Sequence, residues 1–337
     1  MRKILFFFYL LPFMGWSQQR PHYTQYILNN YIVNPAITGI ENYVDIKMSA
    51  RNQWTGIDGA PRTFYLTIHG ALNKPDHRLT ATSFPIKGEN PRGKEYWTYY
   101  NAAIPHHGLG FTAVNYTTGY INRLTTYATY AYHVGLSTNT SLSAGFGAGI
   151  SQFSINRSKI SLAEDFDPII NTTAGQLKQF KPEVNAGLWL YAADYFVGVS
   201  AQQILPTQLQ LIDNQANQST QVPHIFATAG YKLFMNDDWS LTPSIMTRYI
   251  SGLPLALDVN FKTQYLDQFW IGGSYRKGDG ISGMFGININ QTMNISYAYD
   301  LSINNNLLRT VHKGTHELMI GFLLNNIYGD WSPRNVW

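Results

Sequence analysis

The side chains best suited to chemistry are histidines and a carboxylate near the C-terminus. His312, His316 and Glu317 could share a metal ion if they lay on a helix, because residues four apart share a helix face. They instead straddle the start of a segment with strand-like alternation, where four residues span roughly 13 Å. A shared metal site is therefore disfavoured, and the pair His106 and His107 is interpreted as a solvated turn.

Motifs of the common enzyme classes do not occur in the sequence. It contains no Gly-x-Ser-x-Gly nucleophile elbow, no P-loop, no dinucleotide fingerprint and no His-Glu-x-x-His zinc motif. We therefore expect no catalytic residue, no metal site and no cofactor.

The composition of the 337-residue chain favours a membrane barrel. Charged residues make up 13% and aromatic residues 15% of the sequence, so a water-soluble surface is hard to build. Mean hydropathy is only -0.19, and after the N-terminus no stretch approaches the roughly 20 continuous apolar residues of a spanning helix. The other structure that satisfies its backbone hydrogen bonds inside lipid is a closed β-barrel.

The first 17 residues have the pattern of a secretory signal peptide. Arg2 and Lys3 form the basic start, residues 4–14 are apolar, and residues 15–17 end in a small side chain. Removing Arg2 and Lys3 would lower the formal net charge from +4 to +2. A nearly neutral mature chain argues against a nucleic-acid partner, and the absence of cysteine excludes a disulfide framework.

Alternation of apolar and polar residues recurs along the rest of the chain. Odd positions of 255–262 are apolar and even positions small or polar, and 293–302 alternates likewise, so one face suits lipid and the other a polar lumen. We predict an all-β fold, a transmembrane antiparallel β-barrel of about 14 strands over residues 43–327. The predicted strands are 43–53, 62–71, 108–117, 121–135, 140–153, 182–192, 194–203, 222–234, 238–250, 254–265, 267–277, 280–290, 291–303 and 315–326.

An even strand number places both ends of the barrel on the periplasmic side. Short connections such as 192–194 and 236–238 are then periplasmic turns. The long connections 154–181, 204–221 and 304–314 are extracellular loops.

Apolar side chains within these polar loops could anchor a partner protein. The alternative is that they only pack the loops against one another. The residues are Phe166, Ile169, Ile170, Leu209, Leu211, Ile212, Leu307 and Leu308, with Phe153 at the edge of the first loop.

Three segments depart from the hairpin pattern. Residues 18–42 are predicted to form an N-terminal periplasmic segment, or a plug at the periplasmic mouth. Residues 72–107 are predicted to be a periplasmic insert, because their four prolines are incompatible with central strands; a missed strand pair is the alternative. Residues 328–337 form a C-terminal periplasmic tail.

Charges of both signs lie on the polar face of the predicted strands. Closing the barrel brings the first strand against the last, and a buried charge is tolerated only when it is paired. We therefore predict a charge network across the lumen, whereas a wide water-filled pore would leave each charge solvated. The residues are Asp45, Lys47, Arg51, Asp258, Lys262, Arg276, Asp300 and Glu317.

Several short motifs, in a characteristic order, resemble the PorP/SprF family of Bacteroidota, outer-membrane barrels of type IX secretion. The resemblance extends over nearly the whole mature chain. The motifs are Asn34-Pro35-Ala36 with Gly39, Arg51-x-Gln53-Trp54 with Pro61-x-Thr63, Ser143-Ala144-Gly145 with Gly149-Ile150, Pro243-Ser244, Gly273-Ser274-Tyr275-Arg276, Tyr297-Ala298-Tyr299-Asp300 and Gly314-Thr315-His316-Glu317.

This resemblance implies a non-enzymatic role in the outer membrane of a Gram-negative, Bacteroidota-like cell. The implied partners are a large secreted adhesin-like protein, bound through its type B C-terminal domain, and the type IX translocon with its periplasmic components. Gliding motility is the associated process. The insert 72–107 departs from the family pattern, in which the chain turns quickly at this point.

Two other functions are compatible with a barrel. A porin or small-solute uptake channel is the main alternative. An outer-membrane hydrolase would need its Ser and His on a lipid-facing surface, and those faces are apolar here.

Overall fold

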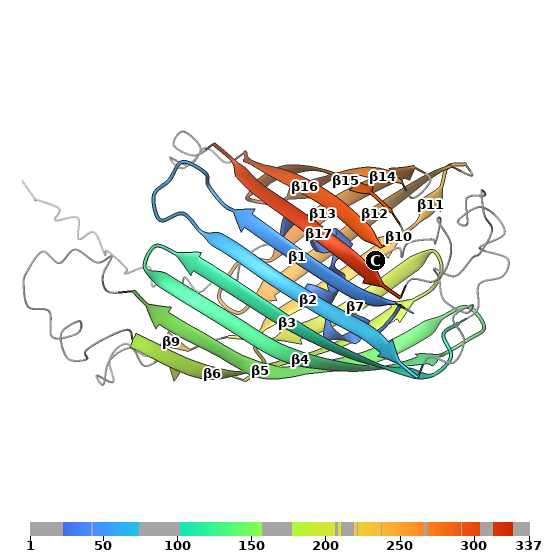
Figure 1. Cartoon of the computed structure of the whole chain (residues 1–337), viewed down its shortest axis with the longest axis horizontal. Coiled ribbons are helices and arrows are strands. Elements are labelled where there is room, and N and C mark those ends of the chain that lie inside the picture. Colours follow the sequence, from blue (N-terminus) through green and yellow to red (C-terminus); the bar gives the residue numbers. More distant parts are fainter. Residues whose placement is uncertain are drawn as a thin grey trace, which may run out of the picture.

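The computed structural model describes most of the chain. The described residues are 23–41, 43–73, 102–156, 177–205, 208–209, 219–220, 222–236, 238–265, 268–290, 292–303 and 313–325. Figure 1 shows tilted antiparallel strands that enclose a short segment from near the N-terminus. No helix among the described residues is long and apolar enough to cross a membrane.

The described strands form a closed barrel of 14 antiparallel strands. β10 and β11 pair in turn with β12 as one interrupted strand, while β8 and β9 form a separate small sheet. The strands are β1 (Val44–Asn52), β2 (Arg62–Leu72), β3 (His106–Thr118), β4 (Ile121–Gly135), β5 (Ser141–Ile155), β6 (Leu177–Tyr191), β7 (Tyr195–Gln202), β8 (Gln208–Leu209), β9 (Ser219–Thr220), β10 (His224–Tyr231), β11 (Leu233–Phe234), β12 (Trp239–Ile250), β13 (Ala256–Tyr265), β14 (Phe269–Arg276), β15 (Gly280–Asn288), β16 (Met293–Ser302) and β17 (Thr315–Leu324).

Pairing of the first strand with the last closes the barrel. Val44 of β1 lies opposite Leu324 of β17, and Asn52 lies opposite His316, so the whole of β1 is paired on this side. Closure leaves neither strand with an unpaired edge, which the membrane interior would not tolerate.

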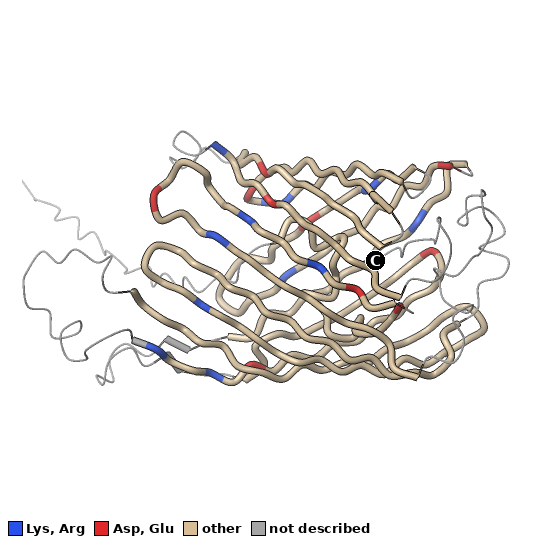
Figure 2. The backbone as a smooth tube through the Cα atoms, viewed as in Figure 1, with Lys and Arg blue, Asp and Glu red and all other residues tan. Residues whose placement is uncertain are grey.

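Alternating burial along the strands separates a lipid face from a lumen face. In β13, Val259 and Phe261 are 45% and 55% exposed, whereas Asp258 and Asn260 are each 2% exposed. The predicted direction of the alternation, with apolar residues outward, is therefore confirmed. Figure 2 shows that acidic and basic positions interleave along the strands and do not form a ring of one sign.

The predicted strands match the observed ones closely, with one clear exception. β6 begins at Leu177, so the end of the predicted loop 154–181 is strand, as is its start up to Ile155. Pro182 is the first residue of the predicted strand 182–192. Its ring is tolerated because β6 pairs with β7 only from Ala186 onward, and Pro occurs on strand edges that have no neighbour.

The two ends of the barrel differ in their connections. The end called here the turn end has short connections such as 192–194 and 235–238. The loop end has the longer connections 53–61, 251–255 and 303–314, together with the short connection 277–279. In outer-membrane barrels short turns face the periplasm and longer loops face the exterior. The loop end, on the left in Figure 1, is therefore the outer end. Of the insert 72–107, residues 74–101 lie outside the described part of the chain.

Three short 3-10 helices lie inside the barrel. They are η1 (Thr24–Leu28), η2 (Asn30–Ile32) and η3 (Pro35–Ile37), and together with their connections they are called here the lumen segment, residues 23–41. Most of its residues are buried. The lumen segment gives the barrel a filled interior.

The two faces of β13 and β14 should respond differently to substitution. Val259→Arg places a charge in lipid and should lower the free energy of unfolding by about 2 to 4 kcal/mol if the site lies near the bilayer midplane. Ser274→Ala, on the lumen face, should change it little, because the Ser274 hydroxyl makes no hydrogen bond in the described structure. Denaturant unfolding in lipid vesicles measures both, and equal losses would contradict the assignment of faces.

Candidate functional site: the occupied lumen and its loop end

The lumen segment begins at the loop end of the barrel. The Thr24 backbone N–H donates to Glu317 Oε2 at 2.8 Å, and the Thr24 hydroxyl donates to Asp300 Oδ2 at 2.7 Å. The Gln25 side-chain amide donates to the Glu317 carbonyl oxygen at 3.0 Å. These partners belong to β16 and β17, so the start of the segment is tied to the strands that close the barrel.

Hydrogen bonds to well-separated strands hold the middle of the segment. The Tyr26 hydroxyl accepts from Asn260 Nδ2 of β13 at 2.6 Å, and the Tyr31 hydroxyl lies 2.7 Å from Thr129 Oγ1 of β4. Burial raises the pKa of both phenols well above the usual range, so they stay neutral. The segment thus spans the lumen from one wall to another.

The motif Asn34-Pro35-Ala36 packs on the wall near the turn end. Asn34 Oδ1 accepts from the Ala36 N–H at 3.0 Å and starts η3, while Asn34 Nδ2 donates to the Leu188 carbonyl of β6 at 3.0 Å. Ser143 Oγ donates to the Ala36 carbonyl at 2.6 Å. Gly145 leaves room for this approach, because a Cβ there would overlap Pro35 and Ala36. The motifs Asn34-Pro35-Ala36 and Ser143-Ala144-Gly145, each a weak sequence signal alone, therefore contact each other in the fold.

Three histidines clamp the end of the segment. His69 Nδ1 accepts from the Gly39 N–H at 3.2 Å, His106 Nε2 lies 3.0 Å from the Gly39 carbonyl, and His133 Nε2 lies 2.9 Å from the Thr38 carbonyl. This histidine clamp joins β2, β3 and β4 to the consecutive residues Thr38 and Gly39.

The interpretation of His106 and His107 as a solvated pair is wrong for His106. Its side chain is buried and its ring stacks on His133 with centroids 4.5 Å apart. His107 points outward and lies 2.7 Å from the Tyr130 hydroxyl. Adjacent strand residues face opposite sides, so only one of the two could enter the lumen.

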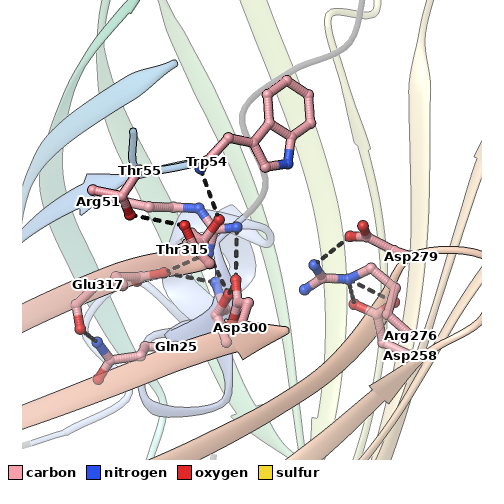
Figure 3. Close-up of polar contacts among 12 residues, drawn as sticks. Gln25, Arg51, Trp54, Thr55, Asp258, Arg276, Asp279, Asp300, Thr315 and Glu317 are labelled. Carbon is pink, nitrogen blue, oxygen red and sulfur yellow. Dashed lines mark hydrogen bonds and ion pairs between the residues drawn. The ribbon is translucent and has the colours of Figure 1, made fainter. Parts of the chain in front are cut away.

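The predicted charged residues all lie on the lumen face of their strands. Several of them meet at the loop end. Arg51 Nη2 lies 2.8 Å from Asp300 Oδ2 and Arg51 Nη1 lies 3.1 Å from Glu317 Oε2, as Figure 3 shows. Arg51 also donates to the Thr24 hydroxyl. These residues come from β1, β16, β17 and the lumen segment, and the pairing lowers the cost of burying them.

A second group of charges lies beside the first. Arg276 Nε is 3.3 Å from Asp258 Oδ2, and Arg276 Nη1 is 3.0 Å from Asp279 Oδ2. Asp279 belongs to the connection 277–279 and was not among the predicted residues, because a loop carboxylate carries no alternation signal.

Lys47 pairs with Asp45 on the same face of β1. Lys262 lines a cavity of about 290 Å³, partly open to solvent, beside Tyr26. The described ion pairs lie within one strand or join strands at most two places apart in the sheet. They do not bridge the lumen directly; the lumen segment makes the connection between walls.

The predicted partner-binding residues are not placed by the structure. Phe166, Ile169, Ile170, Leu211, Ile212, Leu307 and Leu308 lie outside the described residues, and of Leu209 only the backbone, in β8, is described. They stay predictions. Within the described chain no group of histidines and carboxylates could hold a metal ion, and His316 Nδ1 instead lies 2.6 Å from the Tyr297 hydroxyl.

Together these features define an outer-membrane β-barrel whose lumen is occupied by its own N-terminal segment. Residues 16–322 match the family described as type IX secretion system membrane protein PorP/SprF. The chain therefore belongs to that family, and the resemblance noted in its motifs is confirmed.

Solved structures with a similar overall arrangement are distant in sequence. The Ralstonia pickettii toluene transporter TbuX is 10% identical, with 87% of this chain and 92% of that chain covered and a TM-score of 0.49. The Acinetobacter baumannii outer membrane protein Omp33 is 8% identical, with 85% and 100% covered and a TM-score of 0.46. No curated protein sequence matches the chain.

The direction of the lumen segment can be tested by labelling, because the chain contains no cysteine. Tyr23→Cys should react with a membrane-impermeant maleimide on intact cells, since Tyr23 lies at the loop end beside Tyr65. Asn139→Cys, in the exposed connection between β4 and β5 at the turn end, should react only after the outer membrane is permeabilised. Labelling of Asn139→Cys alone on intact cells would mean that the barrel is oriented the other way.

The occupied lumen should make the purified protein nearly silent in a planar bilayer. Gly108→Ala should raise the conductance severalfold, because a Cβ at Gly108 would overlap the Thr38 carbonyl and displace the clamped end of the segment. Gly283→Ala is the matched control, since a Cβ there meets nothing within 4 Å. Large currents from the unaltered protein would contradict an occupied lumen.

Proposed function

We propose that this protein is a non-enzymatic docking subunit of the type IX secretion apparatus. In this role it helps to export a large secreted adhesin-like protein and keeps it on the cell surface by binding the protein's type B C-terminal domain. The observation that carries the proposal is the occupied lumen. Hydrogen bonds hold the lumen segment against β4, β6, β13 and β17. A barrel filled in this way is better suited to binding a protein than to letting solutes diffuse through it.

The proposed contact lies on the outer side. The connections 154–181, 204–221 and 304–314 supply hydrogen-bonding side chains together with apolar anchors, the combination found at protein interfaces. The proposed inner partners are the translocon and its periplasmic components. A signal peptide over residues 1–17 and a part in gliding motility belong to the same proposal.

A porin or solute-uptake channel is the second candidate. The small cavity beside Tyr26 and Lys262, which is partly open to solvent, is the observation that favours it. The conductance of the unaltered protein separates the two roles.

Purification of the full chain from its own outer membrane tests the docking role. A large secreted surface protein should co-purify with it, and replacing residues 206–221 by a short Gly-Ser link should release that protein into the medium. Barrel assembly should be unaffected, because loops contribute little to barrel stability. A shortened protein that reaches normal levels and still retains its partner would exclude this loop as the binding surface. Absence of any secreted partner from the intact protein would overturn the proposed function.

A further inference from the structure

We propose that a cleft at the loop end of the lumen, called here the Trp54 cleft, binds a lysine or arginine side chain of a polypeptide presented from outside. This inference rests on the proposed docking role and names the chemistry of one contact. The cleft is a shallow depression open to solvent, and its lining includes Arg51, Gln53, Trp54, Arg276, Asp279 and Asp300.

Two carboxylates of the cleft, Asp300 and Asp279, are open to a ligand to different degrees. Asp300 Oδ2 is taken by Arg51 and by the Thr24 hydroxyl, but its Oδ1 is buried and has no hydrogen-bond partner among the described residues. Asp279 gives Oδ2 to Arg276, and its side chain is 54% exposed. A buried acceptor without a donor is costly, so the cleft is suited to a ligand that brings N–H groups.

Arg51 adds a donor at the same place. Its Nε is buried without a hydrogen-bond partner in the described structure, although both terminal nitrogens are paired. A peptide carbonyl next to a basic side chain would satisfy this N–H. The combination of open acceptors and one donor fits a basic residue together with its own backbone.

Trp54 provides an aromatic surface at the mouth of the cleft. Figure 3 shows its indole standing between the Arg51 group and the Arg276 group. An aromatic ring beside carboxylates is a favourable setting for a cation. The backbone that carries the ring is held in place: the Trp54 backbone N–H donates to Thr315 Oγ1 at 3.1 Å, and the Thr55 backbone N–H donates to the Gly314 carbonyl at 2.9 Å.

The backbone of Trp54 supports a specific role for this side chain. Its φ of 51° is in the left-handed region, which large side chains seldom occupy and which stores strain mainly at functional positions. Glycine or asparagine would fit this turn more easily. We therefore infer that position 54 is a tryptophan because of its aromatic ring, and not because tryptophan favours this backbone conformation.

An acidic ligand fits the cleft less well. The terminal nitrogens Nη1 and Nη2 of Arg51 and the Nη1 and Nε of Arg276 are bonded to carboxylates, so an anion would have to displace Glu317, Asp258 or their neighbours. Arg248 is the other strand cation near this group, and Lys277 and Lys313 lie on the exposed rim. A basic side chain needs no such displacement at Asp279, whose side chain is exposed.

Fluorine NMR of the purified full-length barrel, labelled with 5-fluorotryptophan, provides the test. The Trp54 resonance is assigned with Trp54→Phe. Titration with acetyl-Gly-Arg-Gly-amide should shift this resonance in a saturable way, and acetyl-Gly-Gln-Gly-amide should not. Asp279→Asn should weaken arginine-peptide binding at least tenfold. The control is Asp58→Asn, an exposed carboxylate in the connection 53–61 that carries Trp54, which should leave binding unchanged.

Three results would overturn the inference: no shift with the arginine peptide, an equal shift with the glutamine peptide, or equal weakening by Asp58→Asn. The last would indicate unspecific attraction to surface charge. Asp279→Asn spares the buried pairs of Arg51, so loss of folding is not expected, and heat-modifiable migration on gels checks this.

The same variants separate this inference from the proposed function. If a secreted partner co-purifies equally with the unaltered protein, Trp54→Ala and Asp279→Asn, the docking role stands and the Trp54 cleft is not its contact. If no secreted partner co-purifies with the unaltered protein, the docking role fails, while the peptide titration still decides whether the cleft binds a cation.

Discussion

Closure of the barrel between β1 and β17 is the constraint on which the rest of the structure depends. Lipid offers no hydrogen bonds to backbone groups, so the sheet must have no edge within the membrane. The pairing that removes the edge also places Arg51 opposite Glu317. Arg51 and Glu317 meet at this seam, and Thr24 of the lumen segment contacts both of them. The connection 53–61, which carries Trp54, begins at the end of β1 beside it. The site at the loop end is therefore a product of how the barrel closes.

The strands could be predicted because lipid and lumen make opposite demands on neighbouring residues. In β13, Val259 and Asp258 differ by one position and lie in opposite environments, and this alternation can be read from the sequence. β6 begins at Leu177, ahead of the predicted strand 182–192. Pro182 is tolerated within it because this part of β6 has no β7 neighbour and so loses no ladder bond there. Local composition cannot reveal that a strand lacks a neighbour.

The site was less predictable because it depends on contacts between distant residues. The charges of Arg51, Asp300 and Glu317 were recognised, but their pairing through Thr24 was not, since the segment that holds Thr24 has no periodic pattern. The burial of His106 was missed for a related reason. A histidine at the start of a strand looks solvated until its carbonyl partner, Gly39, is known from the fold.

The lumen segment is held by different chemistry at its two ends, and this bears on the proposed role. At the turn end, histidine ring nitrogens hold the backbone groups of Thr38 and Gly39, and Gly108 leaves room for this close approach. Such contacts depend on shape. At the loop end, Thr24 and Gln25 contact charged residues that also line the Trp54 cleft. Charge-assisted contacts respond to an added charge more than shape-based ones do. A partner that engaged Asp300 from outside would thus act on the start of the segment and leave its clamped end in place, so docking would not require the lumen to open.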